Sequence, residues 1–316
     1  MAINVTALDA FNNELAGRML MDTVYVGNTA EYVEIQEGVK YQEPLNLASV
    51  TPYFQGGDTV STASGSLDFT QRNITVSKRT AYDLWNLQLL TSKYLGKAVL
   101  DAGSYEDTMT ILTGLSDDLV KKAQQLNDDF VWNAKAGEVF PGSTVTAAGD
   151  GLKVIISGST AGVVSATGDG ASAIAASTAY AQLTSMLSQV DVNVLDAGDL
   201  TIFCGTSVFQ RIISGLTTQN LFHFDPTSVA SRNGMYEVPF PGYPNVKIVG
   251  IYGLRSSERV IVGPASDIFI GTDLSSDTSN FQLWYDINDD ALKYRLRNKL
   301  GTQIGHPQYF VSNDLA

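Results

Sequence analysis

The sequence predicts an α+β fold, and three observations lead to this class. Apolar side chains recur at steps of three and four over residues 104–135, which is the period of a long amphipathic helix. Residues 245–311 divide into short strand-like runs that turn residues separate. The other elements follow no strand–helix–strand rhythm, so a parallel α/β sheet is not expected.

The first 44 residues are expected to form an extended arm that packs elsewhere. A short helix is predicted over residues 7–21, with short strands at 24–26 and 32–35. The first residues lack the basic start and the apolar run of a secretory signal peptide. We therefore expect no export signal and no separate domain here.

Residues 45–80 are predicted to form a long hairpin. Gly56, Gly57 and Asp58 interrupt it near the middle, and residues 73–77 alternate polar and apolar side chains. An isolated two-stranded ribbon is barely stable in water, so this hairpin needs a neighbour. Two interpretations stay open: a hairpin on the edge of a sheet, or a projecting loop that lies across an adjacent subunit.

The strongest predicted helix, residues 104–135, has acidic residues in its first turn and Gly137 as a stop. At 1.5 Å per residue it spans roughly 45 Å, a length typical of a structural spine. The pairs Asp117–Asp118 and Asp128–Asp129 are interpreted as its solvent-exposed face. One apolar face is predicted to carry Leu112, Leu115, Leu119, Ala123, Leu126 and Phe130.

The middle of the chain is rich in small and polar residues before regular elements resume. The composition predicts a flexible hairpin or surface loop, then a helix, a strand, a second helix and a loop with anchored aromatic residues. The loop, the first helix and the strand are residues 141–171, 175–190 and 200–204. The second helix starts near Thr206 or Ser207 with Val208, Ile212 and Leu216 inward, and the aromatic loop is residues 217–245.

Composition narrows the classes of function. The chain has 316 residues, enough for a sizeable core. Its net charge of −13 is not that of a protein that grips nucleic acid through phosphates. Cys204 is the only cysteine and is predicted to be a buried apolar residue, so no disulfide framework exists. No apolar stretch approaches about 18 residues, so no membrane span is expected.

The candidate metal and catalytic patterns fail on inspection. Residues 286–290 begin like a calcium loop, but the glycine position is Ala291 and the final glutamate position is Arg297. A tight turn between two strands is the better interpretation. His223 and His306 stand in no metal-ligand spacing. We predict no catalytic residue, cofactor or metal, and hence no enzyme.

Four cations alternate with other residues along one predicted strand, which places them on a single face. They are Lys293, Arg295, Arg297 and Lys299. One interpretation is a subunit contact or a face that meets packaged DNA. The other is a solvated face that Asp286 and Asp289 balance.

Three C-terminal features carry a family resemblance: Gly271-Thr272-Asp273-Leu274, the strand at 281–286 after a polar turn, and a long strand that ends in residues 300–307. Together with the order of hairpin, long helix and mixed region, this block resembles the HK97-type major capsid proteins of tailed bacteriophages. The resemblance implies residues 1–44 as an N-terminal arm, 45–80 as an extended β-hairpin loop, 81–171 as a peripheral domain with the spine helix at 104–135, 172–272 as an axial domain, 273–302 as a β-hairpin of the peripheral domain, and 303–316 as the C-terminal strand of the axial domain.

The resemblance also implies a function. Such a protein assembles with many copies of itself, as hexamers and pentamers, into the icosahedral shell around double-stranded DNA. It is assembled in the host cytoplasm and ends in the virion. Portal, scaffolding and decoration proteins are its further partners, packaged DNA is a non-specific neighbour, and no membrane is involved. The candidate subunit-contact residues are Gly56, Gly57, Asp58, Lys78, Arg79, Lys293, Arg295, Arg297 and Lys299.

Three alternatives stay open. An encapsulin-like compartment shares the fold, and neighbouring genes for a cargo enzyme would identify it. A hydrolase or binding module with an unrecognised site would stay monomeric and gain thermal stability with its ligand. A tail or decoration protein would form tubes, rings or trimers instead of closed shells.

Overall fold

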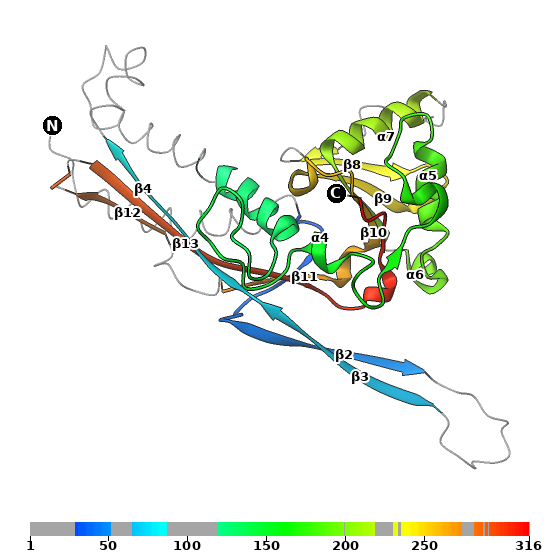
Figure 1. Cartoon of the computed structure of the whole chain (residues 1–316), viewed down its shortest axis with the longest axis horizontal. Coiled ribbons are helices and arrows are strands. Elements are labelled where there is room, and N and C mark those ends of the chain that lie inside the picture. Colours follow the sequence, from blue (N-terminus) through cyan, green and yellow to red (C-terminus); the bar gives the residue numbers. More distant parts are fainter. Residues whose placement is uncertain are drawn as a thin grey trace.

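In the computed structural model, the described part of the chain contains two β-sheets, a separate two-stranded ribbon and a set of helices, so the α+β class is confirmed. Figure 1 shows an elongated molecule with a compact body at one end, from which a long narrow sheet and the ribbon extend in different directions. The structure describes residues 29–51, 65–86, 119, 121–198, 200–218, 230–232, 235–273, 281–286, 288–289 and 291–315.

A seven-stranded mixed sheet forms the centre of the body. Its central strand is parallel to one neighbour and antiparallel to the other, and all six of its residues are buried, which explains its apolar sequence. In spatial order the strands are β5 (Val164–Ser165), β14 (Val311–Ser312), β10 (Val260–Pro264), β6 (Leu200–Gly205), β9 (Tyr243–Ile251), β8 (Met235–Phe240) and β7 (Ala230–Arg232).

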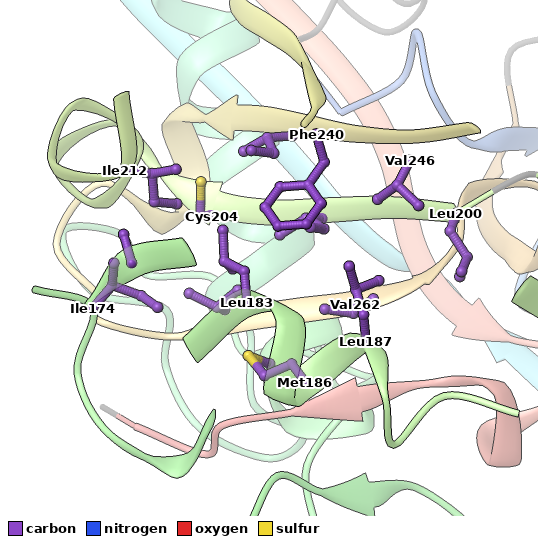
Figure 2. Close-up of a cluster of buried hydrophobic side chains, with 14 of the residues drawn as sticks. Ile174, Leu183, Met186, Leu187, Leu200, Cys204, Ile212, Phe240, Val246 and Val262 are labelled. Atoms are coloured by element: carbon purple, nitrogen blue, oxygen red, sulfur yellow. The ribbon is translucent and has the colours of Figure 1, made fainter. Parts of the chain in front are cut away.

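This sheet separates two hydrophobic cores, because successive side chains of a strand point to opposite faces. Ile202 and Cys204 of β6 belong to the first core, and Phe203 belongs to the second. The first core lies under α5 (Ala179–Leu187), α6 (Val192–Ala197) and α7 (Thr206–Thr218), and Figure 2 shows its side chains meeting between the helices and the sheet. The predicted inward residues of α7, Val208, Ile212 and Leu216, are all buried.

The second core joins the sheet to the helix at residues 121–133. Trp132 is fully buried with its ring 5.7 Å from that of Phe203. Phe310 fills the space above Gly263, where a Cβ atom would stand 2.2 Å from the Phe310 ring. Residues 141–171 pack against this core through α4 (Leu152–Ile155) and Ile156, so the expectation of a surface loop is wrong.

A five-stranded sheet runs from the body along the length of the molecule. The long strand predicted to end in residues 300–307 is β13 (Ala291–Ile304). It pairs with β4 (Ser77–Asn86) along ten residues, and with β11 (Ile268–Thr272) and β12 (Phe281–Asp286). The short β1 (Glu34–Gln36) adds to β11 in parallel.

The predicted hairpin is confirmed as the ribbon of β2 (Gln42–Thr51) and β3 (Ser66–Thr75), which are paired along ten residues. After Val76 the chain continues directly from β3 into β4, so one extended path leads from the ribbon into the long sheet. Val39, Ile74 and Val76 form a small core at the root of the ribbon. Figure 1 shows the rest of the ribbon projecting away from the body.

The helix predicted over residues 104–135 is described over 121–133, and residues 104–118 lie outside the described part. It ends before Gly137, whose positive φ of 78° belongs to the following turn. The predicted faces are partly wrong, because Leu126 is 55% exposed and Asp128 is 4% exposed. The helix contacts both the long sheet and the loop after β9, so it buries two flanks instead of one stripe.

Other boundaries also differ from the predictions. The predicted helix at 175–190 is the shorter α5, and the expected loop at 217–245 contains β7 and β8. The expected strand near residue 308 begins as the 3-10 turn Pro307–Tyr309 and becomes β14 afterwards. Among the described residues, no helix combines the length and the apolar character needed to cross a membrane.

Candidate functional site

The structure brings the four cations of β13 to one face of the long sheet, as the alternation predicts. On the adjacent strand β4, Lys78 is the register partner of Lys299 and Thr80 is the partner of Arg297. Tyr82 and Leu84 follow as the partners of Arg295 and Lys293. This arrangement gives one surface with cations on β13 and apolar side chains on the outer part of β4.

Lys293 is held inside the chain and is not available to a partner. Its Nζ donates to Asp286 Oδ2 at 2.7 Å and to Asp289 Oδ2, and only 9% of the residue is exposed. The hydrogen bond to Asp286, followed by that to Asp289, raises the pKa of Lys293. The hydrogen bond from Lys293 in turn lowers the pKa of Asp286. Lys293 therefore stabilises the connection between β12 and β13 through two ion pairs. The interpretation that Asp286 and Asp289 balance the charge of Lys293 is confirmed.

The connection between β12 and β13 is the turn that the sequence predicts in place of a calcium loop. The backbone N–H of Asn288 donates to Asp286 Oδ1 at 2.9 Å, which is the geometry of an Asx turn. Next to this turn, Asp286 and Ala291 form the first residue pair of the β12–β13 ladder.

The other cations of this face divide into two kinds. Arg295 donates to Gln282 Oε1 and stands 5.8 Å from the centre of the Trp284 ring, and Lys299 donates to Asp273. Arg297 and Lys78 are exposed and make no hydrogen bond or ion pair within the described part of the chain. Only these two cations of the predicted set are free to meet another molecule.

Arg79 points to the opposite face of the sheet from Lys78, toward the helix at residues 121–133. Its Nη1 donates to Asn127 Oδ1 at 2.7 Å, and its guanidinium lies 4.6 Å above the centre of the Phe130 ring. Burial lowers the pKa of Arg79 to about 10. Gly56, Gly57 and Asp58, the remaining predicted contact residues, lie outside the described residues.

The ribbon carries a surface that the sequence prediction missed. Val50 and Leu67 are cross-strand partners and Phe69 lies on the same face, with exposures of 66%, 55% and 74%. Singly exposed apolar residues are ordinary, but these three gather on one face of the projecting ribbon and form an exposed apolar patch. Their alternation with polar residues was visible in the sequence, yet it is the same signal that a half-buried strand gives.

A buried carboxylate joins three segments that are remote in sequence, and the sequence prediction missed it too. Asp128 accepts hydrogen bonds from the backbone N–H and the hydroxyl of Thr29 and from the backbone N–H of Gly253 at 2.8 Å. Trp132 Nε1 donates to the Thr29 hydroxyl at 2.7 Å. Burial raises the pKa of Asp128. The network fixes the helix to the N-terminal segment and to the loop after β9.

The described residues offer no arrangement typical of catalysis or metal binding. No group of three or more His, Cys, Asp or Glu residues within them is placed to hold a metal ion. Cys204 is fully buried, as predicted, and burial raises the pKa of its thiol, which makes a poor nucleophile. His306 Nδ1 lies 2.9 Å from Asp267 Oδ1, a structural pairing, and His223 lies outside the described residues.

This chain resembles known proteins in structure and not in sequence. No model of a protein family and no curated protein matches the sequence. Solved structures do match. A chain of the satellite phage P4 procapsid, solved with its size determination (Sid) protein, superposes with a TM-score of 0.58 at 8% identity over 93% of this chain and 89% of that chain.

Two further structures agree with the first. A chain from Gordonia phage Cozz superposes with a TM-score of 0.56 at 11% identity, over 90% of this chain and 85% of that chain. A chain from the capsid of an empty GTA particle gives 0.51 at 8% identity, over 90% and 88%. The chain has the HK97-like capsid fold. Because the HK97-like match extends over about nine-tenths of each chain, it is not a likeness of one core alone.

Proposed function

We propose that this chain is a major capsid protein that assembles with copies of itself into an icosahedral shell around phage double-stranded DNA. The observation that carries the proposal is the projecting ribbon with its exposed apolar face, on a fold shared with chains of phage and GTA capsids. The role is structural and not catalytic. In this proposal the functional site is a set of contact surfaces and not a pocket.

The parts of the molecule have distinct roles in this proposal. The ribbon is the extended loop, which reaches a neighbouring subunit. Residues 1–44 are the N-terminal arm, and its described part lies against its own chain through Thr29, β1 and Val39. The helix at 121–133 with the β4–β13 sheet is the peripheral domain, and β12–β13 is its hairpin. The body around the seven-stranded sheet, residues 172–272 and 303–316, is the axial domain near the centre of a hexamer or pentamer.

Shell formation follows from the physics of repeated contacts. Each copy presents one surface and receives another, so the contacts are heterologous and close on themselves around the shell. Apolar burial contributes about 25 cal/mol per Å² of surface removed from water. The exposed ribbon face adds such area without any change in the body. Many modest contacts of this kind then hold a shell that no single contact could hold.

The charges fit proximity to packaged DNA and not recognition of it. The net charge is −13, and within the described basic face only Lys78 and Arg297 are unpaired. Two cations neutralise too few phosphates for tight or sequence-specific binding. In the proposal, DNA is therefore a non-specific neighbour inside the virion, while portal, scaffolding and decoration proteins bind the assembled shell.

Electron microscopy of the purified chain at high concentration tests this proposal. Closed shells of uniform size are the expected result, and a persistent monomer would contradict it. Deletion of residues 56–66 should leave a folded subunit, because the body has its own cores, but one that cannot close shells. Normal particles from the deletion variant would show that the loop is not needed for closure.

A further inference from the structure

Two glycines meet inside the long sheet, and neither strand needs them for its own geometry. Gly271 of β11 and Gly301 of β13 are register partners, so they lie side by side on one face of the sheet. Glycine weakens a strand interior, because it has no side chain to pack and loses more backbone entropy than other residues. Neither glycine has a positive φ. A glycine in such a regular strand points to the close approach of another segment.

The segment that approaches is the root of the ribbon, where β3 continues into β4. β4 lies in the plane of the sheet beside β13, whereas the residues just before β4 cross the face of the sheet. A Cβ atom on Gly301 would stand 2.2 Å from the carbonyl oxygen of Thr75, and one on Gly271 would stand 2.5 Å from Ile74 Cγ2. Both separations are far below the roughly 3.5 Å at which non-bonded heavy atoms pack. The root therefore rests directly on the two glycines.

Hydrogen bonds hold the crossing on either side of this contact. On the ribbon side, Gln303 Nε2 donates to the backbone carbonyl of Asn73 at 2.9 Å. On the β4 side, the backbone N–H of Ala148 donates to Ser77 Oγ at 2.8 Å. The glycine contact between these two bonds sets how closely the chain passes over the sheet. The crossing therefore has one height and one direction.

The ribbon beyond the crossing acts as a lever. Figure 1 shows it projecting from the long sheet, and the large apolar side chains farther out, Leu67 and Phe69, are exposed. The described part of the chain thus fixes the direction of the ribbon at its root. At about 3.3 Å per residue the ribbon is roughly 33 Å long, so a tilt of about 5° at the root moves its outer end by roughly 3 Å.

We infer that Gly271 and Gly301 set the direction in which the ribbon leaves the long sheet and, through that direction, the curvature of the shell. The second half rests on the proposed self-assembly. If copies meet through a projecting ribbon, the angle between ribbon and sheet enters the rotation that relates one copy to the next, and this rotation decides whether and at what size the assembly closes. Both glycines are positioning residues that act through the ribbon.

Distances between the ribbon and the rest of the unassembled subunit test the first half. Ser66→Cys places a spin label at the exposed outer end of β3. Val192→Cys or Val139→Cys places the second label, at positions that are 67% and 58% exposed. Double electron–electron resonance on the two pairs follows a tilt of the ribbon from two reference points. The native Cys204 is fully buried and should stay unlabelled.

Three alanine variants are compared in this labelled chain. Gly301→Ala should shift at least one of the distances by roughly 3 Å, because the added Cβ meets backbone that has to move. Gly271→Ala should give a smaller shift, since the methyl group of Ile74 can turn away. The matched control is Gly205→Ala in the body, whose Cβ would stand 2.1 Å from the carbonyl oxygen of Leu254. It should lower the stability of the subunit in urea and leave both distances unchanged.

Unchanged distances in a folded Gly301→Ala subunit overturn the inference. If that variant does not fold, Gly271→Ala decides by the same measurement. Failure of both variants to fold would make the glycines a requirement for folding, and this also overturns the inference.

Electron microscopy of the same variants tests the link to curvature. Shells of a variant with shifted distances should differ in diameter from wild-type shells or stay open, whereas Gly205→Ala shells should keep the wild-type diameter. Shifted distances with shells of unchanged diameter refute the link. Failure of the unmodified chain to form shells counts against the proposed function itself and leaves the distance measurement valid.

Discussion

The root and the outer half of the ribbon have the same sequence pattern but opposite environments. At the root, Ile74 and Val76 alternate with polar residues and are buried against Val39 and the long sheet. Farther out, Leu67 and Phe69 alternate in the same way and are exposed. Within β3, Ile74 points to the opposite face from Leu67 and Phe69, because successive side chains of a strand alternate. The chain covers the inner apolar side chains itself, and in our proposal a second molecule covers the outer ones.

The compact body contains buried apolar side chains like those at the root of the ribbon. The largest effect on stability is expected from a substitution there. Phe310→Ala empties a fully buried site against Gly263, and such a cavity costs about 3–5 kcal/mol of unfolding free energy. Urea unfolding of unassembled subunits measures it. The matched substitution Phe69→Ala removes an equally large ring from an exposed site and should change stability by less than about 0.5 kcal/mol. Equal losses at the two sites would break the comparison.

A smaller effect is expected from the buried carboxylate of the body. Burial raises the folded-state pKa of Asp128 above its unfolded value of about 4, so between these values the folded chain binds more protons than the unfolded chain. The free energy of unfolding that Asp128 contributes therefore falls as the pH rises through that window, by at most about 1.4 kcal/mol per pH unit.

Asp128→Asn removes this titration and is the variant that measures it. Urea unfolding of both proteins across the pH range should show wild type gaining on Asp128→Asn toward low pH and losing that advantage as the pH rises. Asp129, whose charge also acts on Asp128, pairs with Arg255 at 3.3 Å and is unchanged in both proteins. Parallel pH profiles would mean that the pKa of Asp128 is the same in the folded and the unfolded chain.

Much of the fold could be predicted because local signals were strong. The short apolar runs of β6 and β10, the alternation along β13, the helical period of α7 and the turn at Asp286 all depend on near neighbours in the sequence. The predictions failed where segments distant in the sequence determine whether a side chain is buried. Asp128 looks like a solvated helix residue until Thr29 and Gly253 are brought to it. Leu126 fits the predicted apolar face, but the surface that would cover it is not part of the described chain.

The cations of β13 show the same limit of sequence-based prediction more clearly. The sequence correctly placed four cations on one face of β13 and offered Asp286 and Asp289 as balancing acids, but it gave no sign that Asp273 pairs with Lys299. Two of these acids are in the adjacent turn, whereas Asp273 follows another strand. Charge pairing across strands depends on register, and register is a tertiary property.

The smallest expected effect on subunit stability comes from the outer ribbon, and it is the sharpest test of the comparison. Replacing Val50, Leu67 and Phe69 together by Thr keeps strand propensity and removes only exposed apolar surface. Unfolding of the isolated subunit should change by less than about 0.5 kcal/mol per site. Shells should nevertheless be lost, because the removed surface serves another copy. Electron microscopy and urea unfolding of the same preparation measure both effects.

A matched control separates the effect of a residue's position from the effect of making it polar. Val139→Thr with Val192→Thr makes the same kind of change at residues outside the ribbon that are 58% and 67% exposed, and these particles should assemble normally. If both variants lose assembly, polar substitution of any exposed valine is harmful and the ribbon is not special. If neither does, the exposed face of the ribbon is not an assembly surface. Loss in the ribbon variant alone means that a side chain can be dispensable for folding of its own chain and necessary for the next one, which is the difference between the two halves of the ribbon.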